Sequence, residues 1–372
     1  MKIAGVVQAL ESIAPSELAE DWDNVGLLVG DEGLDVKHLM VCVDLTTEVL
    51  REAVRSKAQM ILAHHPVIPK SISRVTSRRA PTVFEAVRRN IAIYCMHTNF
   101  DSVRGGTTDV LVEALGLVRT RALSSRVLHD KCKIVTFVPP DELSEVSGAA
   151  FAAGAGQIGA YRDCAFFSHG IGVFCGGEGT HPTVGRAGDH EAAEEIRLEV
   201  VAPKLKASRV CAAIRAAHSY EMPAIDVYPL EDHNQASGLC QVGELTRPVT
   251  VRRLIERVKK NLGVKGTLVA GMPGKRGSSK KANLVSTAAC CAGAGRGFVA
   301  DAIAAGATFY LTGEIGHHDA VAACEAGMTV LLVGHGNSER AAMKRLSMRL
   351  RGMLSKVKVS FARADRDPLE VV

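Results

Sequence analysis

The chain has 372 residues, of which 47% are hydrophobic, 23% charged and 4% aromatic, and its formal net charge is +5. This length allows two or three domains with a large core, and the mild basic excess permits an anionic ligand without requiring nucleic acid. The sequence contains neither an apolar run of about 18 residues nor a signal-peptide pattern at its start, so we expect a cytoplasmic protein.

Strands and helices alternate in the first third of the chain. Helices are predicted by apolar spacing over 2–14, 47–57, 80–89 and 107–115, and strands over 39–43, 60–63 and 91–96. Such alternation predicts a mostly parallel sheet with helices on both faces.

The pattern changes in the middle of the chain. Strands are predicted over 133–138, 169–175, 194–201 and 224–228, and helices over 141–153 and 204–218. This β-α-β-β-α-β order predicts a ferredoxin-like inserted domain over 128–232. Its histidines lack metal-ligand spacing and are expected in loops or on the surface; they are His169, His181, His190, His218 and His233.

The first pattern returns after the insert. Helices are predicted over 250–261, 298–305 and from 335 to about 354, and strands over 284–289, 309–311 and 328–333. We therefore predict an α/β fold in which two α/β halves, 1–127 and 233–372, have mostly parallel sheets and form one core.

Ten cysteines are scattered along the chain, without a Cys-x-x-Cys pair. Most lie in apolar segments that are predicted to form strands. We expect buried, reduced thiols rather than disulfides or a zinc knuckle.

Three predicted strands end in side chains that can bind metal. The strand at 60–63 is followed by His64 and His65, and Pro66 then stops any regular continuation. His97 and Asp101 follow the next strand, and two further residues, His335 and Glu339, follow a strand near the end of the chain. A spacing of four places both members of each later pair on one face of a helical turn.

The chemistry of these residues favours a dinuclear metal site. Imidazole and carboxylate groups suit zinc, manganese and iron, ligands in α/β folds bind at the carboxyl ends of strands, and one carboxylate can bridge two ions. Such a site makes hydroxide available near neutral pH. A pair of ordinary loop histidines is the alternative for His64 and His65 taken alone.

Five segments together resemble the GTP cyclohydrolase I type 2 homolog family, the Nif-three-like dinuclear-metal proteins. These segments are 22–27, 63–66, 97–101, 312–320 and 334–339. The resemblance covers about 1–125 and 235–365. The segment 217–229 resembles the PII-like, ferredoxin-like domain that a longer subset of the family carries as an insert.

The resemblance implies two divalent metal ions per subunit, with zinc first and iron or manganese as alternatives. It implies metal ligation by five residues, with Glu339 as the bridge: His64, His65, Asp101, His335 and Glu339. Two histidines, His97 and His317, are candidate catalytic proton carriers, with a place among or behind the ligands as the alternative. The resemblance also implies a toroidal homohexamer. In one departure, Gly336 stands where the family usually has an aromatic residue, which puts substrate stacking in doubt.

Two functions follow from this reading. The first is hydrolysis of GTP cyclohydrolase type, in which metal-bound hydroxide attacks a nucleotide-like small molecule. The alternative is a metal-sensing or metal-handling protein that signals through its PII-like insert without turnover. The low aromatic content and modest charge disfavour nucleic acid as a partner, and no membrane partner is expected.

Three segments keep two interpretations each. Asp23 and Asn24 either form a turn or support the metal-site loops. The glycine-rich segment 293–297 either binds phosphate through backbone N–H groups or makes a tight turn. The basic run 275–281 is either a solvated loop or an anion-binding segment.

Overall fold

Two compact units make up the chain in the computed structural model, which describes residues 1–123, 126–127, 131–230, 236–274 and 284–369. The core unit comprises 1–126 and 236–372, and the insert unit comprises 127–235. The basic run at 275–281 and His233 lie outside the described residues. Within those residues, every helix is too short or too polar to cross a lipid bilayer.

The first sheet of the core unit has five strands in the order β1-β4-β3-β2-β17. The four strands β4, β3, β2 and β17 pair in parallel, and β1 is antiparallel to β4. Their bounds are Gly26–Val29 (β1), His38–Cys42 (β2), Met60–Ala63 (β3), Ala92–Cys95 (β4) and Lys358–Phe361 (β17). This sheet fits the prediction of mostly parallel pairing.

Short helices precede, connect and follow the strands β1 to β4. They are α1 (Ile3–Glu11), η1 (Ser16–Leu18), α2 (Thr47–Arg55), α3 (Pro81–Arg88), α4 (Thr98–Ser102) and α5 (Thr107–Leu115). The Thr46 hydroxyl caps α2 by accepting the Val49 N–H. Val49 and Leu50 of α2 pack with Ala86 of α3 in one apolar cluster that includes Ile61 and Ile93 of the sheet. This packing buries the strands that carry the histidine pairs and fixes where they end.

The second sheet of the core unit has six strands in the order β13-β16-β15-β14-β12-β5. Its strands are Leu117–Ala122 (β5), Cys240–Thr250 (β12), Leu268–Ala270 (β13), Leu284–Ala294 (β14), Phe309–Glu314 (β15) and Thr329–Leu332 (β16). Only β14–β15 and β15–β16 are parallel pairs, and the other three pairs are antiparallel. The prediction of a mostly parallel sheet is wrong for this half, because strands were missed at both of its edges.

The missed strands have weak sequence patterns. β12 contains Arg247 and Pro248, and its pairing with β14 shifts register between Glu244 and Val249. Such an irregularity interrupts the period-two alternation that identifies a strand. β5 is largely exposed, and β13 and β17 are only three and four residues long. None of them offers the apolar run that marked the central strands.

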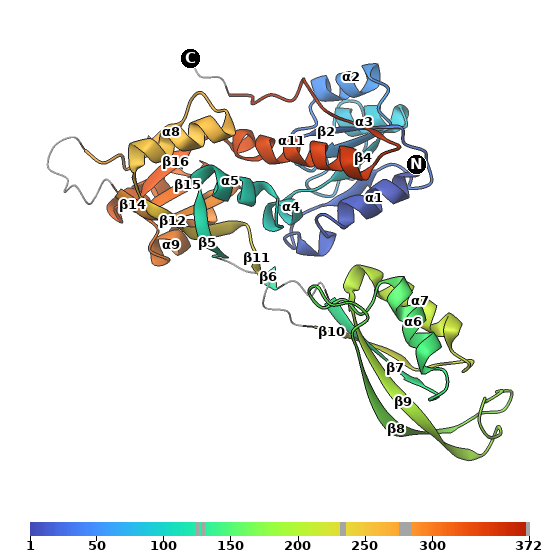
Figure 1. Cartoon of the computed structure of the whole chain (residues 1–372). Coiled ribbons are helices and arrows are strands. Elements are labelled where there is room, and N and C mark those ends of the chain that lie inside the picture. The colour runs from blue at the N-terminus through green and yellow to red at the C-terminus, as the bar shows by residue number, and fades with distance from the viewer. Residues whose placement is uncertain (124–125, 128–130, 231–235, 275–283, 370–372) are drawn as a thin grey trace. The chain divides into compact units, whose positions relative to one another are not determined.

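Four helical segments and the long helix α11 complete the second part of the core unit. They are α8 (Val251–Leu262), η4 (Gly295–Phe298), α9 (Val299–Ala304), α10 (His317–Glu325) and α11 (His335–Met353). Helix α11 contacts β2 and β17 of the first sheet and β14 and β15 of the second (Figure 1). It therefore ties both sheets together, and its first turn begins where they meet.

The insert unit has the predicted β-α-β-β-α-β order, with its four strands arranged as β10-β7-β9-β8 in an antiparallel sheet. The elements are β7 (Lys131–Val138), α6 (Leu143–Ala153), β8 (Ala165–Cys175), β9 (His190–Pro203), η2 (Lys204–Lys206), α7 (Ala207–Ala217) and β10 (Ile225–Pro229). Two short strands, β6 (Arg126–Val127) and β11 (Ala236–Ser237), lie at the sequence boundaries of the two units. Helices α6 and α7 pack with the strand residues Ile134 and Leu198 in a separate core.

Candidate metal centre

Six side chains of metal-ligand type, from three strand ends, come together in the core unit. Two groups of donor atoms form, each with all its atoms within 4.8 Å of one another. One group contains His64, His65 and His97, and the other contains His65, His335 and Glu339. The sixth side chain is Asp101, whose Oδ1 lies 3.4 Å from Nε2 of His64.

The first pair of donors is held by the end of β3. Backbone N–H groups of His64 and His65 continue the ladder to the neighbouring strand, donating to the Val43 carbonyl at 3.2 and 3.0 Å. The His64 side chain is fully buried, whereas that of His65 is 23% exposed. The two neighbouring rings lie 5.1 Å apart and differ in their exposure to solvent.

The second pair follows β4. His97 precedes the short helix α4, and the Asp101 N–H donates to the His97 carbonyl at 3.0 Å. The expected one-face arrangement is present, because the His97 ring lies 5.3 Å from the His64 ring and Asp101 lies beside the same imidazole. The Thr107 hydroxyl donates a hydrogen bond to Asp101 and fixes its carboxylate.

The third pair lies on the first turns of α11. His335 Nε2 is 3.3 Å from Glu339 Oε1, as the spacing of four predicts. Glu339 is almost completely buried, and its carboxylate faces the other strand ends, with Oε1 3.7 Å from His64 Nε2 and Oε2 3.3 Å from His65 Nε2. This one carboxylate contacts histidines from both sheets and lies at the centre of the cluster.

Each of the four imidazoles is anchored through Nδ1. The partners of Nδ1 are the Met96 carbonyl for His64 at 2.8 Å, Asp44 for His65 at 2.8 Å, Asp23 for His97 at 2.9 Å and Glu314 for His335 at 3.0 Å. An acceptor at Nδ1 keeps the proton there and leaves Nε2 with a free lone pair, which is how metal-binding histidines are oriented.

The acids around the cluster shift the pKa values of its members. Although burial opposes the effect, Asp44 and Glu339 raise the pKa of His65 to about 10. Burial also opposes ionisation of Glu339, but His64 and His65 hold its pKa well below the usual range. Burial, together with the negative charge of Glu339, raises the pKa of Asp101. The cluster therefore needs positive charge at its centre, which protons or metal ions can supply.

Several polar atoms at this centre have no hydrogen-bond partner. Among the described residues, five buried side-chain nitrogen and oxygen atoms lack one, and three of these are His64 Nε2, His65 Nε2 and Glu339 Oε2. Unpartnered buried polar atoms are costly unless something else binds them. Two ligands of a tetrahedral zinc ion lie about 3.4 Å apart, which matches the 3.3–3.4 Å between neighbouring donors here. The residues therefore fit divalent metal ions.

His317 joins neither group of donor atoms among the described residues. It begins helix α10, where its side chain is exposed and its ring packs against His318 at a centroid distance of 5.5 Å. Its predicted catalytic role stays a prediction.

Sequence reasoning missed two acids that orient the cluster, Asp44 and Glu314. Both follow or end a buried strand, so the pattern that identified the histidines could also have found them. For Asp23 the structure supports the second interpretation, since its carboxylate accepts from His97 and from the Thr98 N–H at 3.1 Å. These hydrogen bonds, with burial opposing them, lower the pKa of Asp23 to about 2.

The glycine-rich segment also lines the cluster. Gly293 has φ +60°, and a Cβ atom there would lie 2.7 Å from Glu339 Oε1 and 3.3 Å from His335 Nε2. Its N–H donates to the Ser338 hydroxyl at 2.8 Å, so it is engaged within the protein rather than free to bind phosphate. The segment provides clearance for the buried carboxylate.

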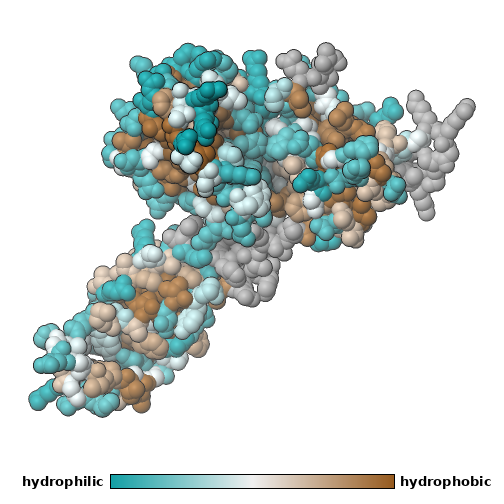
Figure 2. Space-filling model, turned by 180° about the vertical axis from the view of Figure 1, so that it is seen from behind, coloured by the Kyte–Doolittle hydropathy of each residue, from teal (hydrophilic) through white to brown (hydrophobic). Residues whose placement is uncertain are grey.

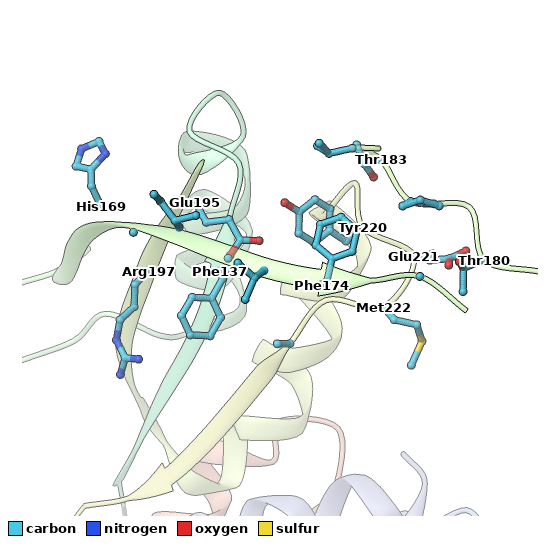
Figure 3. Close-up of a pocket in the computed structure, with 18 of the residues that line it drawn as sticks. Phe137, His169, Phe174, Thr180, Thr183, Glu195, Arg197, Tyr220, Glu221 and Met222 are labelled. Atoms are coloured by element: carbon cyan, nitrogen blue, oxygen red, sulfur yellow. The ribbon is translucent and has the colours of Figure 1, made fainter. Parts of the chain in front are cut away.

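A second candidate site is a cavity of about 540 Å³ in the insert unit (Figure 3). Aromatic and apolar side chains line much of it, including Phe137, Phe174, Tyr220 and Met222. Burial, reinforced by the Glu195 carboxylate, raises the pKa of Tyr220 to about 12, so this phenol stays protonated as a hydrogen-bond donor.

Two hydrogen bonds tie the β8–β9 loop beside this cavity to the segment before β10. The His181 N–H donates to Glu221 at 3.2 Å, and the Thr183 hydroxyl donates to the Ser219 carbonyl at 3.3 Å. Apolar side chains reach the surface of this unit (Figure 2), and Ile171 and Val173 of β8 are 73% and 78% exposed.

Known proteins resemble the chain over nearly its whole length. A family model described as Duf34/NIF3 (NGG1p interacting factor 3) matches residues 1–368. A protein of Halalkalibacterium halodurans named GTP cyclohydrolase 1 type 2 homolog is 32% identical over 359 residues, which are 95% of this chain and 94% of the relative. The Bacillus subtilis protein of the same name is 34% identical over 332 residues, with 89% and 87% covered.

Solved structures agree with these sequence matches. A Bacillus cereus protein related to NIF3 superposes with a TM-score of 0.83 at 32% identity, covering 100% of this chain and 99% of the other. A Staphylococcus aureus protein gives a TM-score of 0.72 at 25% identity with the same coverage. The mixed α/β architecture described above is therefore shared with crystal structures of related proteins.

Proposed function

The chain belongs to the Duf34/NIF3 family, and we propose that it holds two divalent metal ions in the core unit and uses them to hydrolyse a small, nucleotide-like substrate. The observation that carries the metal proposal is the set of anchored imidazoles around Glu339. Their Nε2 atoms converge on one buried carboxylate, and three of the converging atoms lack a hydrogen-bond partner.

Six residues would hold the ions: His64, His65, His97, Asp101, His335 and Glu339. Glu339 is the bridge in this proposal, because its two oxygens face different histidines. The donor set contains nitrogen and oxygen only, which suits zinc first and iron or manganese as alternatives.

The hydrolytic proposal depends on what bound ions supply, namely a lowered pKa of water and polarisation of a substrate oxygen or carbon centre. The residues of this chain supply orientation. Asp23, Asp44 and Glu314 hold three of the imidazole rings in place. The names of the relatives make GTP the first substrate to test.

Metal analysis of the purified protein tests the first half of this proposal. We expect wild-type protein to retain close to two ions per chain, and Glu339→Gln to lose most of them, because an amide cannot bridge two cations. Glu325→Gln is the matched control, since Glu325 is an exposed acid of α10. Full metal content in Glu339→Gln would refute the proposed centre.

An activity assay tests the second half. Metal-loaded wild-type protein is incubated with GTP and with a panel of phosphoesters, and released formate and phosphate are measured with zinc, iron and manganese in turn. Turnover that disappears in Glu339→Gln supports hydrolysis. Metal-loaded protein that releases neither product from any substrate would refute the enzyme while leaving the metal centre standing.

The cavity of the insert unit favours a second candidate function, a sensor or metal handler that binds a small apolar ligand there. Its test uses the full chain and the amphiphilic anionic dye 8-anilinonaphthalene-1-sulfonate. We expect the dye to bind in this cavity and to respond to metal loading, and Val173→Glu with Met222→Glu to abolish that response. A metal response that survives both substitutions would refute coupling through this cavity.

A further inference from the structure

We propose that Trp22 is the substrate-binding platform of the metal centre, and that it stacks against a planar heteroaromatic ring. This inference depends on the proposed function for the position of the reacting group, and it adds the class of molecule that the site accepts. Three observations support it. Trp22 is exposed, its ring is linked by ring contacts to the histidines of the cluster, and the two residues after it are held by hydrogen bonds.

The side chains of the candidate metal centre differ in their exposure to solvent. The side chains of His64 and Glu339 are 0% and 2% exposed, whereas those of His65 and His335 are 23% and 37% exposed. His97 is 17% exposed. These three imidazoles are therefore the donors most accessible to a substrate that approaches from solvent, and the Asp101 side chain is only 12% exposed.

Trp22 lies next to one of these exposed imidazoles. Its ring centroid lies 6.1 Å from that of His97, with the two planes at 78°. His97 in turn lies 5.5 Å from His65, and the His65 ring lies 5.1 Å from that of His335. Ring contacts therefore link Trp22 to His335 through His97 and His65, and Trp22 is the one member of this series without a metal-ligand atom.

The Trp22 side chain is 67% exposed although its neighbours are firmly held. The next residue, Asp23, is bound by His97 and Thr98, and the Asn24 amide donates to the Ile68 carbonyl at 2.6 Å. A large aromatic ring left in water on such a fixed backbone gains nothing for folding. It is preorganised instead for a partner that approaches from solvent.

The chemistry of a tryptophan selects the ligand. Its flat ring stacks on nucleobase-type rings, and this contact contributes about 1–3 kcal/mol per base without regard to base identity. Trp22 offers this stacking surface next to His97, and the polar end of the ligand reaches the imidazoles of the cluster.

The chain contains one tryptophan and five tyrosines, so fluorescence that is excited beyond the tyrosine absorption band reports on Trp22 alone. Metal-loaded wild-type protein is titrated with GTP, with guanosine and with inorganic tripolyphosphate. We expect GTP and guanosine to quench the emission with saturation, and tripolyphosphate to leave it unchanged. Quenching by tripolyphosphate alone would overturn the proposal, because that ligand has no ring to stack.

Calorimetry with variants completes the test. Trp22→Ala should weaken GTP binding about tenfold or more while retaining the wild-type metal content, and Trp22→Phe should recover most of the affinity. Tyr161→Ala is the matched control, because Tyr161 is an aromatic residue of the insert unit that is 76% exposed. Its GTP affinity should equal that of the wild type.

The outcomes separate this proposal from the one before it. If wild-type protein holds no metal, the metal centre fails whatever Trp22 does. If metal content is normal but Trp22→Ala binds GTP as tightly as the wild type, only the platform fails. Loss of metal in Trp22→Ala, or fluorescence that changes with protein concentration rather than with GTP, would also overturn it, in favour of a structural or self-association role.

Discussion

Gly293→Ala is the sharpest test of how the metal centre is built, because the substitution adds one methyl group next to the bridging carboxylate. At φ +60°, an alanine costs roughly 1–2 kcal/mol in backbone energy alone. Its Cβ would also lie 2.7 Å from Glu339 Oε1, well inside van der Waals contact. The buried carboxylate must move, and it cannot move without leaving at least one of its histidines.

We expect this variant to fold, with a free energy of unfolding lowered by about 1–3 kcal/mol, and to bind zinc at least tenfold more weakly. A competition titration against a chromophoric chelator measures the affinity, and urea denaturation of the metal-free protein measures the stability. The two measurements separate backbone strain from the displacement of a ligand.

Gly297→Ala is the matched control within the same glycine-rich segment. Gly297 has no atom within 4 Å of an added Cβ and no positive φ, so alanine there should leave zinc affinity unchanged and stability equal or slightly higher. If Gly293→Ala were to bind zinc as tightly as the wild type and lose only stability, the glycine would serve the backbone and the argument for clearance would be wrong.

Three further predictions follow from the same structure. Asp44→Ala should lower zinc affinity about 10- to 100-fold, because the His65 ring loses the acceptor that orients it. A chelator competition would measure this change, and an unchanged affinity would count against the anchoring. As the pH increases toward 10, zinc affinity should rise by up to about tenfold per pH unit, because the ion must displace the proton that Asp44 and Glu339 hold on His65. Calorimetry at pH 6.5, 7.5 and 8.5 checks this, and an affinity that does not change with pH would contradict it. Burial lowers the pKa of His38 below its usual 6.5, so its neutral form contributes stability that is present above pH 6.5 and is lost as the pH falls below that value. The urea midpoints at pH 8 and pH 5.5 should therefore differ less in His38→Gln than in the wild type. Equal differences in the two proteins would refute the assignment.

Local patterns in the sequence were sufficient for the inner parts of the fold. Helix α5 has the predicted bounds, 107–115, and β3 spans the predicted 60–63. The family resemblance is confirmed by the family model over residues 1–368. These successes share a cause, because a central strand buried on both faces must be apolar throughout, and a helix must repeat its apolar positions every three to four residues.

The orienting acids were harder to predict, because their role depends on contacts far apart in the chain. Asp23 meets His97 across 74 residues, and Asp44 meets His65 across 21. An acid after a strand is equally consistent with a turn, and only the folded chain shows which imidazole it faces. Gly293 is a similar case. A side chain does not fit there because Glu339, 46 positions further on in the sequence, occupies the space.

The two sheets of the core unit show why the site could not be assigned to one half of the chain. Strand β5 precedes the insert but pairs with β12 in the second sheet, and β17 lies near the end of the chain but pairs with β2 in the first. Each sequence half therefore lends an edge strand to the sheet of the other.

The C-terminal segment after β17 contacts residues on both sides of the candidate metal centre. Buried Asp365 accepts the Val43 N–H at 2.8 Å and Arg340 Nη2 at 3.1 Å. Val43 precedes the acid that orients His65, and Arg340 follows the bridging Glu339. One carboxylate of this C-terminal segment therefore binds the backbone next to Asp44 and the side chain of the residue after Glu339. Because the donor side chains follow strands of both sheets, they come together only when the two sheets are packed against each other, and an ion bound to them would stabilise that packing.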